Sequence, residues 1–213
     1  MAISKFTVCF AVAIALIATF NQDVAQAQQR WVANLDASQV VGGSSETGTA
    51  VATFELDAAQ ENLTYAIEIF GLDLKVVAGD RTEFSDVTAI HLHNAPAGAT
   101  GPHVMNIFGM PSEDDAEMVV DFESELINGV YNDADATDPN TGSLFDQNSP
   151  FTTKLLSNFV DDLEDGQIYL AIHTAGQGGN IAIRGQLVAV PEPSSVSLLL
   201  AISALGFGLR RKR

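Results

Sequence analysis

The chain of 213 residues has almost no cysteine and little positive charge. Its single cysteine, Cys9, lies in an apolar N-terminal segment, so the body of the protein has no disulfide to stabilise it. Ten lysine and arginine residues stand against 27 aspartate and glutamate residues. Because binding to nucleic-acid phosphates needs clustered basic side chains, this composition argues against nucleic acid as a partner. Cations or cationic polymers fit such acidity better.

The sequence also lacks an apolar run long enough for a stable membrane span of ~20 residues. A short one, from Phe6 to Phe20, follows the basic residue Lys5 and precedes a small-residue site at Ala25 to Ala27. This order is typical of a secretory signal peptide, which we assign to residues 1–27. The alternative is an uncleaved membrane anchor, for which the apolar run is short.

The other short apolar run, residues 196–209, lies in the C-terminal segment 190–213. Pro191, Glu192 and Pro193 precede it, and four basic residues, Arg210 to Arg213, follow. This segment resembles the PEP-CTERM sorting signal of Gram-negative bacteria that make an extracellular polysaccharide. The resemblance implies recognition by an exosortase and display at the cell surface or in the extracellular matrix. It also implies transient membrane association through residues 196–209. A plain C-terminal membrane tail is the alternative.

Between these ends lies one domain, residues 28–189, whose polar and apolar residues alternate as in β-strands. Residues 28–190 hold 25 acidic and 5 basic residues, a net charge of −20. We predict strands at residues 30–36, 47–57, 63–70, 87–93, 103–108, 167–174 and 180–189. Apolar residues at helical spacing predict one short helix over 152–163, with Thr152 or Thr153 as its N-terminal cap. Many short strands with one helix indicate a mainly β fold, an antiparallel Ig-like or Greek-key β-sandwich.

An acidic segment, residues 109–151, interrupts this pattern. We predict a short strand at residues 118–122 within it and interpret the segment as a solvated insertion, with a calcium site as the alternative. Asp133, Asp135 and Thr137 have the spacing that begins a calcium-binding loop. However, Asp138 stands where such a loop needs glycine, and Leu144 stands where it needs glutamate. The segment is therefore not an EF-hand.

The body as a whole resembles the CHRD, or chordin, domain over about residues 30–188. The resemblance lies in the order of short motifs: Leu35 to Val41, Thr47 to Ala50, Leu63 to Tyr65, Thr88 to His93, Ala95 to Gly98, Gly101-Pro102, Ile172 to Thr174 and Ile183 to Leu187. It implies an extracellular β-rich module and no established reaction. We therefore expect a non-enzymatic binding or structural module, with extracellular polysaccharide or cations as partners.

The protein has four histidines, and all four end or begin predicted strands. His91 and His93 are two residues apart, so both face one side of their strand. His103 follows a loop of glycine, proline and alanine, and His173 ends a later strand. If Ile and Leu mark the core, His91, His93 and His173 lie on the opposite face. Four imidazoles suit copper or zinc, so these residues form a candidate metal site. Histidines with a structural role only are the alternative.

These residues also resemble the copper ligands of copper-zinc superoxide dismutases. The corresponding positions are His91, His93, His103, His173, the segment Gly178 to Asn180 and Arg184. The resemblance implies a redox-active copper, with Arg184 guiding an anionic substrate. The sequence departs from that family because it has no separate zinc-binding cluster after His103 and no cysteine for the family's disulfide. A copper-binding, dismutase-like oxidoreductase is therefore the alternative to the non-enzymatic module. The sequence names no ligand and no oligomeric state, and it does not show whether the tail is cleaved.

Overall fold

The computed structural model describes residues 28–109 and 117–191. The predicted signal peptide, residues 1–27, and the tail from Glu192 onward lie outside these described residues. None of the described helices is long and apolar enough to cross a membrane.

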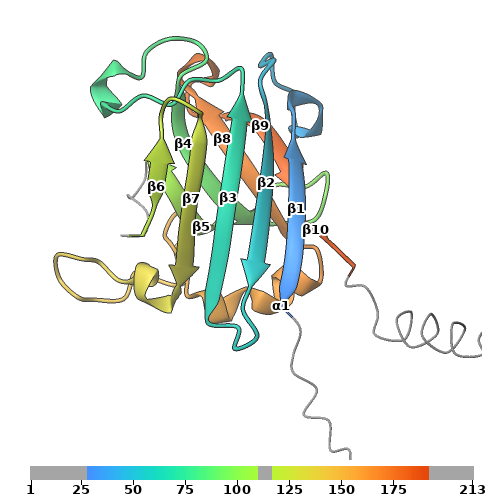
Figure 1. Cartoon of the computed structure of the whole chain (residues 1–213), viewed down its shortest axis with the longest axis vertical. Coiled ribbons are helices and arrows are strands. Elements are labelled where there is room, and N and C mark those ends of the chain that lie inside the picture. Colours follow the sequence, from blue (N-terminus) through green and yellow to red (C-terminus); the bar gives the residue numbers. More distant parts are fainter. Residues whose placement is uncertain (1–27, 110–116, 192–213) are drawn as a thin grey trace, which may run out of the picture.

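Two antiparallel sheets pack face to face, as the sequence predicts (Figure 1). The first has the order β10-β1-β2-β3-β7-β6, and the second has the order β5-β4-β8-β9. In Figure 1 the strands of the second sheet run obliquely behind the first. The strands are β1 (Gln29–Leu35), β2 (Thr49–Leu56), β3 (Asn62–Phe70), β4 (Val87–Asn94), β5 (His103–Gly109), β6 (Val119–Asp121), β7 (Leu126–Asn132), β8 (Ile168–Thr174), β9 (Ile181–Gln186) and β10 (Val188–Ala189).

The core lies between the two sheets and is built by the alternation seen in the sequence. Along β2 every second side chain from Ala50 to Leu56 is buried, and β3 repeats the pattern from Leu63 to Ile69. Buried Ile and Leu residues of β4 and β8 cover this surface from the second sheet. Burial of such side chains is worth about 25 cal/mol per Å² of apolar surface, which stabilises a domain without disulfides.

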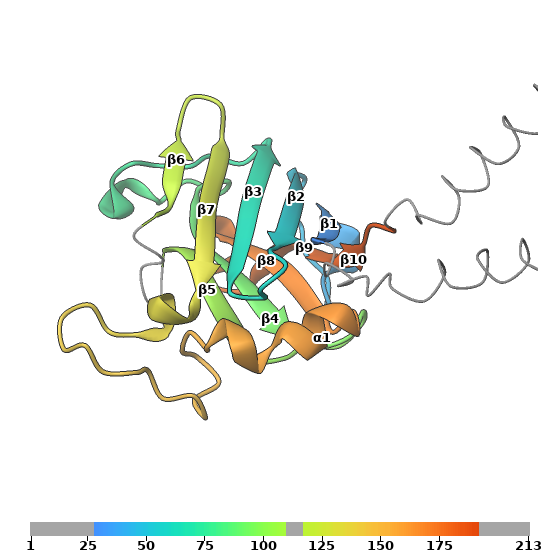
Figure 2. The ribbon, with the colours of Figure 1, turned by 60° about the horizontal axis from the view of Figure 1, so that its bottom comes forward.

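The predicted helix over 152–163 is shorter and later than expected. The α-helix α1 spans Val160–Glu164, and a 3-10 turn, η4 (Leu156–Asn158), precedes it. The first residues of the predicted helix are extended because Lys154 N donates to Val104 O at 2.9 Å, beside the edge strand β5. Neither Thr152 nor Thr153 therefore caps a helix. Figure 2 shows α1 closing one end of the sandwich, where Trp31 Nε1 donates to Leu163 O at 3.1 Å.

The acidic segment 109–151 contributes more to the fold than a solvated insertion would. Two of its parts are β6 and β7, and β7 pairs with β3 along seven residues, from Asn62↔Asn132 to Glu68↔Leu126. A 3-10 turn, η3 (Asp133–Ala136), follows. The carboxylate of Asp133 accepts hydrogen bonds from Ser157, and Asp135 accepts one from Asn132 N at 2.7 Å. These aspartates thus hold local turns together.

Candidate metal centre

Strands β4 and β8 bring three histidines onto the outer face of the four-stranded sheet. In the register between them His93 is opposite Tyr169, His91 is opposite Ala171 and Ala89 is opposite His173. The intervening isoleucines and leucines point into the core, which agrees with the alternation in the sequence. His91, His93 and His173 therefore share one face, as predicted.

His103, the first residue of β5, joins them from the neighbouring edge strand. It lies opposite His93, and Asn106 lies opposite His91. Two β-bulges interrupt this pairing, one between Ile90 and His91 and one between Leu92 and His93. A bulge re-aims side chains, so His103 and Asn106 are both brought beside the imidazoles although they are an odd number of residues apart.

The four imidazole rings form one compact cluster. The ring centroid of His91 lies 4.2 Å from that of His103, 5.0 Å from that of His173 and 5.7 Å from that of His93. The centroids of His93 and His103 are 4.4 Å apart. Ligand atoms of His91, His93 and His173 all lie within 4.8 Å of one another. One ion could therefore contact all three with small side-chain movements.

The cluster is buried, although it lies outside the main core. Exposed fractions are 3% for His91, 6% for His93 and 9% for His173, whereas His103 is half-buried. The sequence predicted which face of the strands carries these histidines, but it did not predict that they would be buried. Imidazoles enclosed in this way suit a tightly held ion more than a loosely bound surface ion.

Backbone carbonyls orient two of the rings. His93 Nδ1 lies 3.0 Å from Gly101 O, and His173 Nδ1 lies 3.0 Å from Gly179 O. Because a carbonyl only accepts, each Nδ1 carries the proton and each Nε2 carries a lone pair. Neither Nε2 has a hydrogen-bond partner among the described residues. Metal-binding histidines are commonly oriented by such a bond from the other ring nitrogen.

The imidazoles of His93, His103 and His173 are neutral at physiological pH. Burial, assisted by neighbouring His103, lowers the pKa of His93 to about 3. Burial likewise lowers the pKa of His103 to about 4, with a contribution from His173, and lowers the pKa of His173. Only the neutral ring offers a lone pair to a metal ion, so ligation needs no further proton loss.

The loop of residues 95–102 contacts the cluster through Gly101 O and His93, and it is fixed by β9. Arg184 donates from Nη1 to Ala99 O and from Nη2 to Pro96 O at 3.1 Å. Gln186 donates from Nε2 to Ala95 O at 3.2 Å. Arg184 is only 2% exposed. Its guanidinium is thus occupied by the loop, in contrast to the substrate guide implied by the dismutase resemblance.

Tyr169 links Arg184 to the face that carries the histidines. The guanidinium carbon of Arg184 lies 3.5 Å from the centre of the Tyr169 ring. The ring of His93 is parallel to that of Tyr169, with centroids 4.9 Å apart. Because β8 lies between β4 and β9, the tyrosine separates the histidine from the arginine. We missed Tyr169 in the sequence, although it has the same strand parity as His173.

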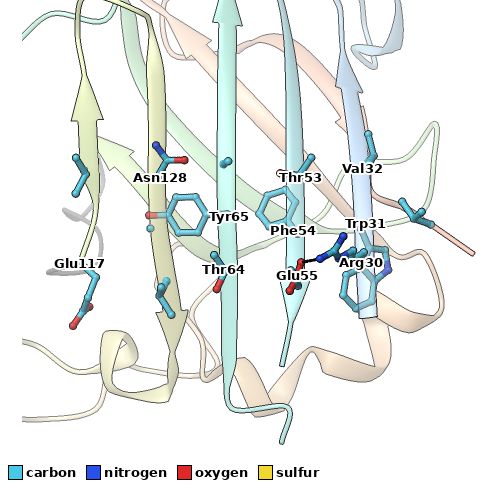
Figure 3. A pocket seen from close by; sticks show the side chains of 15 residues that line it. Arg30, Trp31, Val32, Thr53, Phe54, Glu55, Thr64, Tyr65, Glu117 and Asn128 are labelled. Carbon is cyan, nitrogen blue, oxygen red and sulfur yellow. Dashed lines mark ion pairs between the residues drawn. The ribbon is translucent and has the colours of Figure 1, made fainter. Parts of the chain in front are cut away.

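A shallow groove occupies the opposite surface of the molecule, on the outer face of the six-stranded sheet (Figure 3). Side chains of Val32, Thr53, Thr64 and Asn128 line it. Arg30 pairs with Glu55 at 2.6 Å along one side, which Figure 3 marks as a dashed line. The groove contains none of the histidines, so it and the metal centre are separate features.

An antiparallel β-sandwich with a histidine cluster on one outer face defines an all-β module with a candidate metal centre. The family model of the CHRD domain matches residues 31–187, and the chain therefore belongs to the CHRD family. The model of the PEP-CTERM protein-sorting motif matches residues 189–213. Searches of curated proteins and of solved structures find no match.

Proposed function

We propose that this protein is a non-enzymatic surface or matrix module whose CHRD domain binds one copper or zinc ion. His91, His93 and His173 are the ligands we assign, with His103 beside them. One observation carries the proposal: three buried imidazoles offer ligand atoms within 4.8 Å of one another. Packing alone would not favour the buried Nε2 atoms of His93 and His173, which have no hydrogen-bond partner among the described residues.

The PEP-CTERM motif indicates where the module is sent after synthesis. The motif indicates export, recognition by an exosortase and sorting to the surface of a Gram-negative bacterium. Location in the extracellular matrix, with its polysaccharide as partner, is our further proposal. The groove of Figure 3 supports it, because its hydroxyl and amide groups at Thr53, Thr64 and Asn128 can hydrogen-bond sugars.

A copper-dependent dismutase is the second candidate, and the all-imidazole ligand set favours it. Such an enzyme would need an open position at the metal and a cation facing that position. Arg184 is instead bonded to the carbonyls of Pro96 and Ala99, and the imidazoles beneath the loop are nearly closed to solvent. These contacts support the non-enzymatic proposal.

Metal content tests the proposed function. The chain exported from a bacterial host should contain copper or zinc at one ion per molecule, measured by mass spectrometry. Replacing His91 with alanine should weaken binding by roughly 10- to 100-fold in a copper titration, because one of three ligands is lost. Thr53→Ala, in the opposite groove, is the matched control and should bind as the wild type does.

Absence of stoichiometric metal at micromolar supply would contradict the proposed function. It would leave the four histidines as structural residues. Stoichiometric copper together with rapid superoxide dismutation would instead favour the enzymatic candidate.

Surface sorting should depend on the tail alone. We expect a chain truncated after Val190 to be exported but released into the medium, because it has lost the Pro191 to Pro193 motif and the apolar segment. Immunoblotting of medium and cell-surface fractions measures this outcome. A full-length Gly79→Ala variant, changed outside the groove, is the control and should remain at the surface. Retention of the truncated chain would show that the CHRD domain itself attaches to the surface.

A further inference from the structure

Two cationic side chains interact with the imidazole cluster, although the domain is strongly acidic. Residues 28–190 hold only five basic residues, and of these Arg184 acts electrostatically on His93 and Lys154 on His103. Arg184 is one aromatic ring away from His93, through Tyr169. Lys154 is 8% exposed, and its backbone pairs with Val104, the residue next to His103.

This local charge affects which ion the site can hold. Copper and zinc would be bound by neutral imidazoles alone, so no ligand charge would offset that of the ion. The cost of burying an ion grows with the square of its charge, so it is about four times larger for a divalent ion than for a monovalent one. The two nearby cationic side chains also repel the bound ion, and this repulsion is proportional to the charge of the ion.

The small number of close ligands also favours a monovalent copper ion. The group whose ligand atoms lie together contains His91, His93 and His173, and His103 is not part of it. Structural zinc sites are almost always four-coordinate and tetrahedral, and copper(II) prefers tetragonal surroundings. Copper(I) and zinc(II) both have a closed d¹⁰ shell and no ligand-field preference, so shell structure disfavours only copper(II). Copper(I), with its single charge, is satisfied by two or three ligands, whereas zinc(II) takes a fourth.

We propose that the imidazole cluster selects copper(I) over copper(II) and zinc(II). This inference rests on the proposed function, since it names the ion that the same site takes. Neutral ligands, burial and adjacent cations together favour the lower charge. They should therefore raise the reduction potential of bound copper, as burial and net charge do at other metal sites.

Three affinities measured on one preparation test the inference. The exported protein would be solubilised in mild detergent, after its mass has confirmed that the signal peptide with Cys9 is removed, so that no thiol can bind copper. Copper(I), kept reduced by ascorbate, would be titrated against bicinchoninate, and copper(II) and zinc(II) against chelators of known affinity. We expect the dissociation constant for copper(I) to be lower than the other two by about tenfold or more.

An equal or tighter affinity for zinc(II) or copper(II) would overturn the inference and leave the proposed function in place. Failure of all three ions to bind would overturn the proposed function itself. The two failures are therefore distinguishable.

A charge substitution tests the electrostatic cause. Asn106 lies opposite His91 and is 1% exposed, so Asn106→Asp adds a carboxylate at the cluster with almost no change in shape. We expect the ratio of copper(I) affinity to zinc(II) affinity to fall by about tenfold, because the added negative charge stabilises the divalent ion more than the monovalent one. Asn128→Asp adds the same charge on the opposite face and should leave the ratio unchanged.

Lys154→Gln is the second variant, for use if Asn106→Asp does not fold. Removing this cation should shift the ratio in the same direction. An unchanged ratio in a folded variant of either kind would contradict selection by charge.

Discussion

Replacing Gly101 with alanine should damage both the fold and the candidate metal site. A Cβ at this position would lie 1.7 Å from Asn94 O and 2.5 Å from Asn94 C, so the backbone itself would have to move. The carbonyl of Gly101 is also the acceptor for His93 Nδ1. Chemical denaturation should show a loss of about 2–4 kcal/mol in the free energy of unfolding. Copper titration of the folded fraction should show roughly 10- to 100-fold weaker binding, because His93 loses its orienting bond.

Gly79→Ala is the matched control for this experiment. A Cβ on Gly79 would have nothing within 4 Å, and its backbone has no positive φ that would strain an alanine. We expect its stability to stay within about 0.5 kcal/mol of the wild type. Wild-type copper affinity in Gly101→Ala would show that the loop carbonyl does not orient His93.

Much of the sandwich could be predicted because its strands alternate so regularly. Along β2 and β3 the period of two separates buried from exposed residues, and the structure confirms both strands to within two residues. The same alternation placed His91, His93 and His173 opposite the core side chains. It could do so because strand parity is a local property that depends only on the backbone.

The remainder depends on contacts between distant segments, which local patterns do not contain. The sequence gives no signal for the bulges that bring Asn106 beside His91, since a bulge changes the register between two strands. The orientation of His93 depends on the carbonyl of Gly101, in a loop that Arg184 holds from far along the chain. The segment 152–155 looked helical because its apolar spacing was correct, but pairing of Lys154 with Val104 keeps it extended.

Arg184→Lys should disturb His93 while leaving His173 unchanged, although both are candidate ligands. Lysine keeps the positive charge but loses the planar fork, so it cannot donate to the carbonyls of Ala99 and Pro96 in the same way. A buried carbonyl left without its donor costs about 1–3 kcal/mol. The free energy of unfolding should fall by at least that amount. The loop that carries the acceptor of His93 should also become less fixed.

Nitrogen-15 NMR of the imidazoles in the metal-free protein provides the decisive measurement, because it needs no ion. In the wild type, His93 and His173 should both show a protonated Nδ1 and an unprotonated Nε2, as their bonds to Gly101 O and Gly179 O require. In Arg184→Lys, the His93 signals should move toward the average of the two tautomers. His173 should stay as it is, because its acceptor lies in a different turn, and it thus serves as an internal control.

Arg30→Lys is the control for a guanidinium lost elsewhere. Arg30 is exposed and pairs with Glu55 within the six-stranded sheet, away from the histidines. It should change neither histidine. If Arg184→Lys folds and His93 keeps its wild-type tautomer, Arg184 stabilises the fold but does not orient His93. A selective change at His93 would show that an arginine on β9 acts on the metal centre through the loop, since lysine retains the charge. Any accompanying loss of copper affinity would then measure how much binding gains from a His93 ring that is oriented before the ion binds.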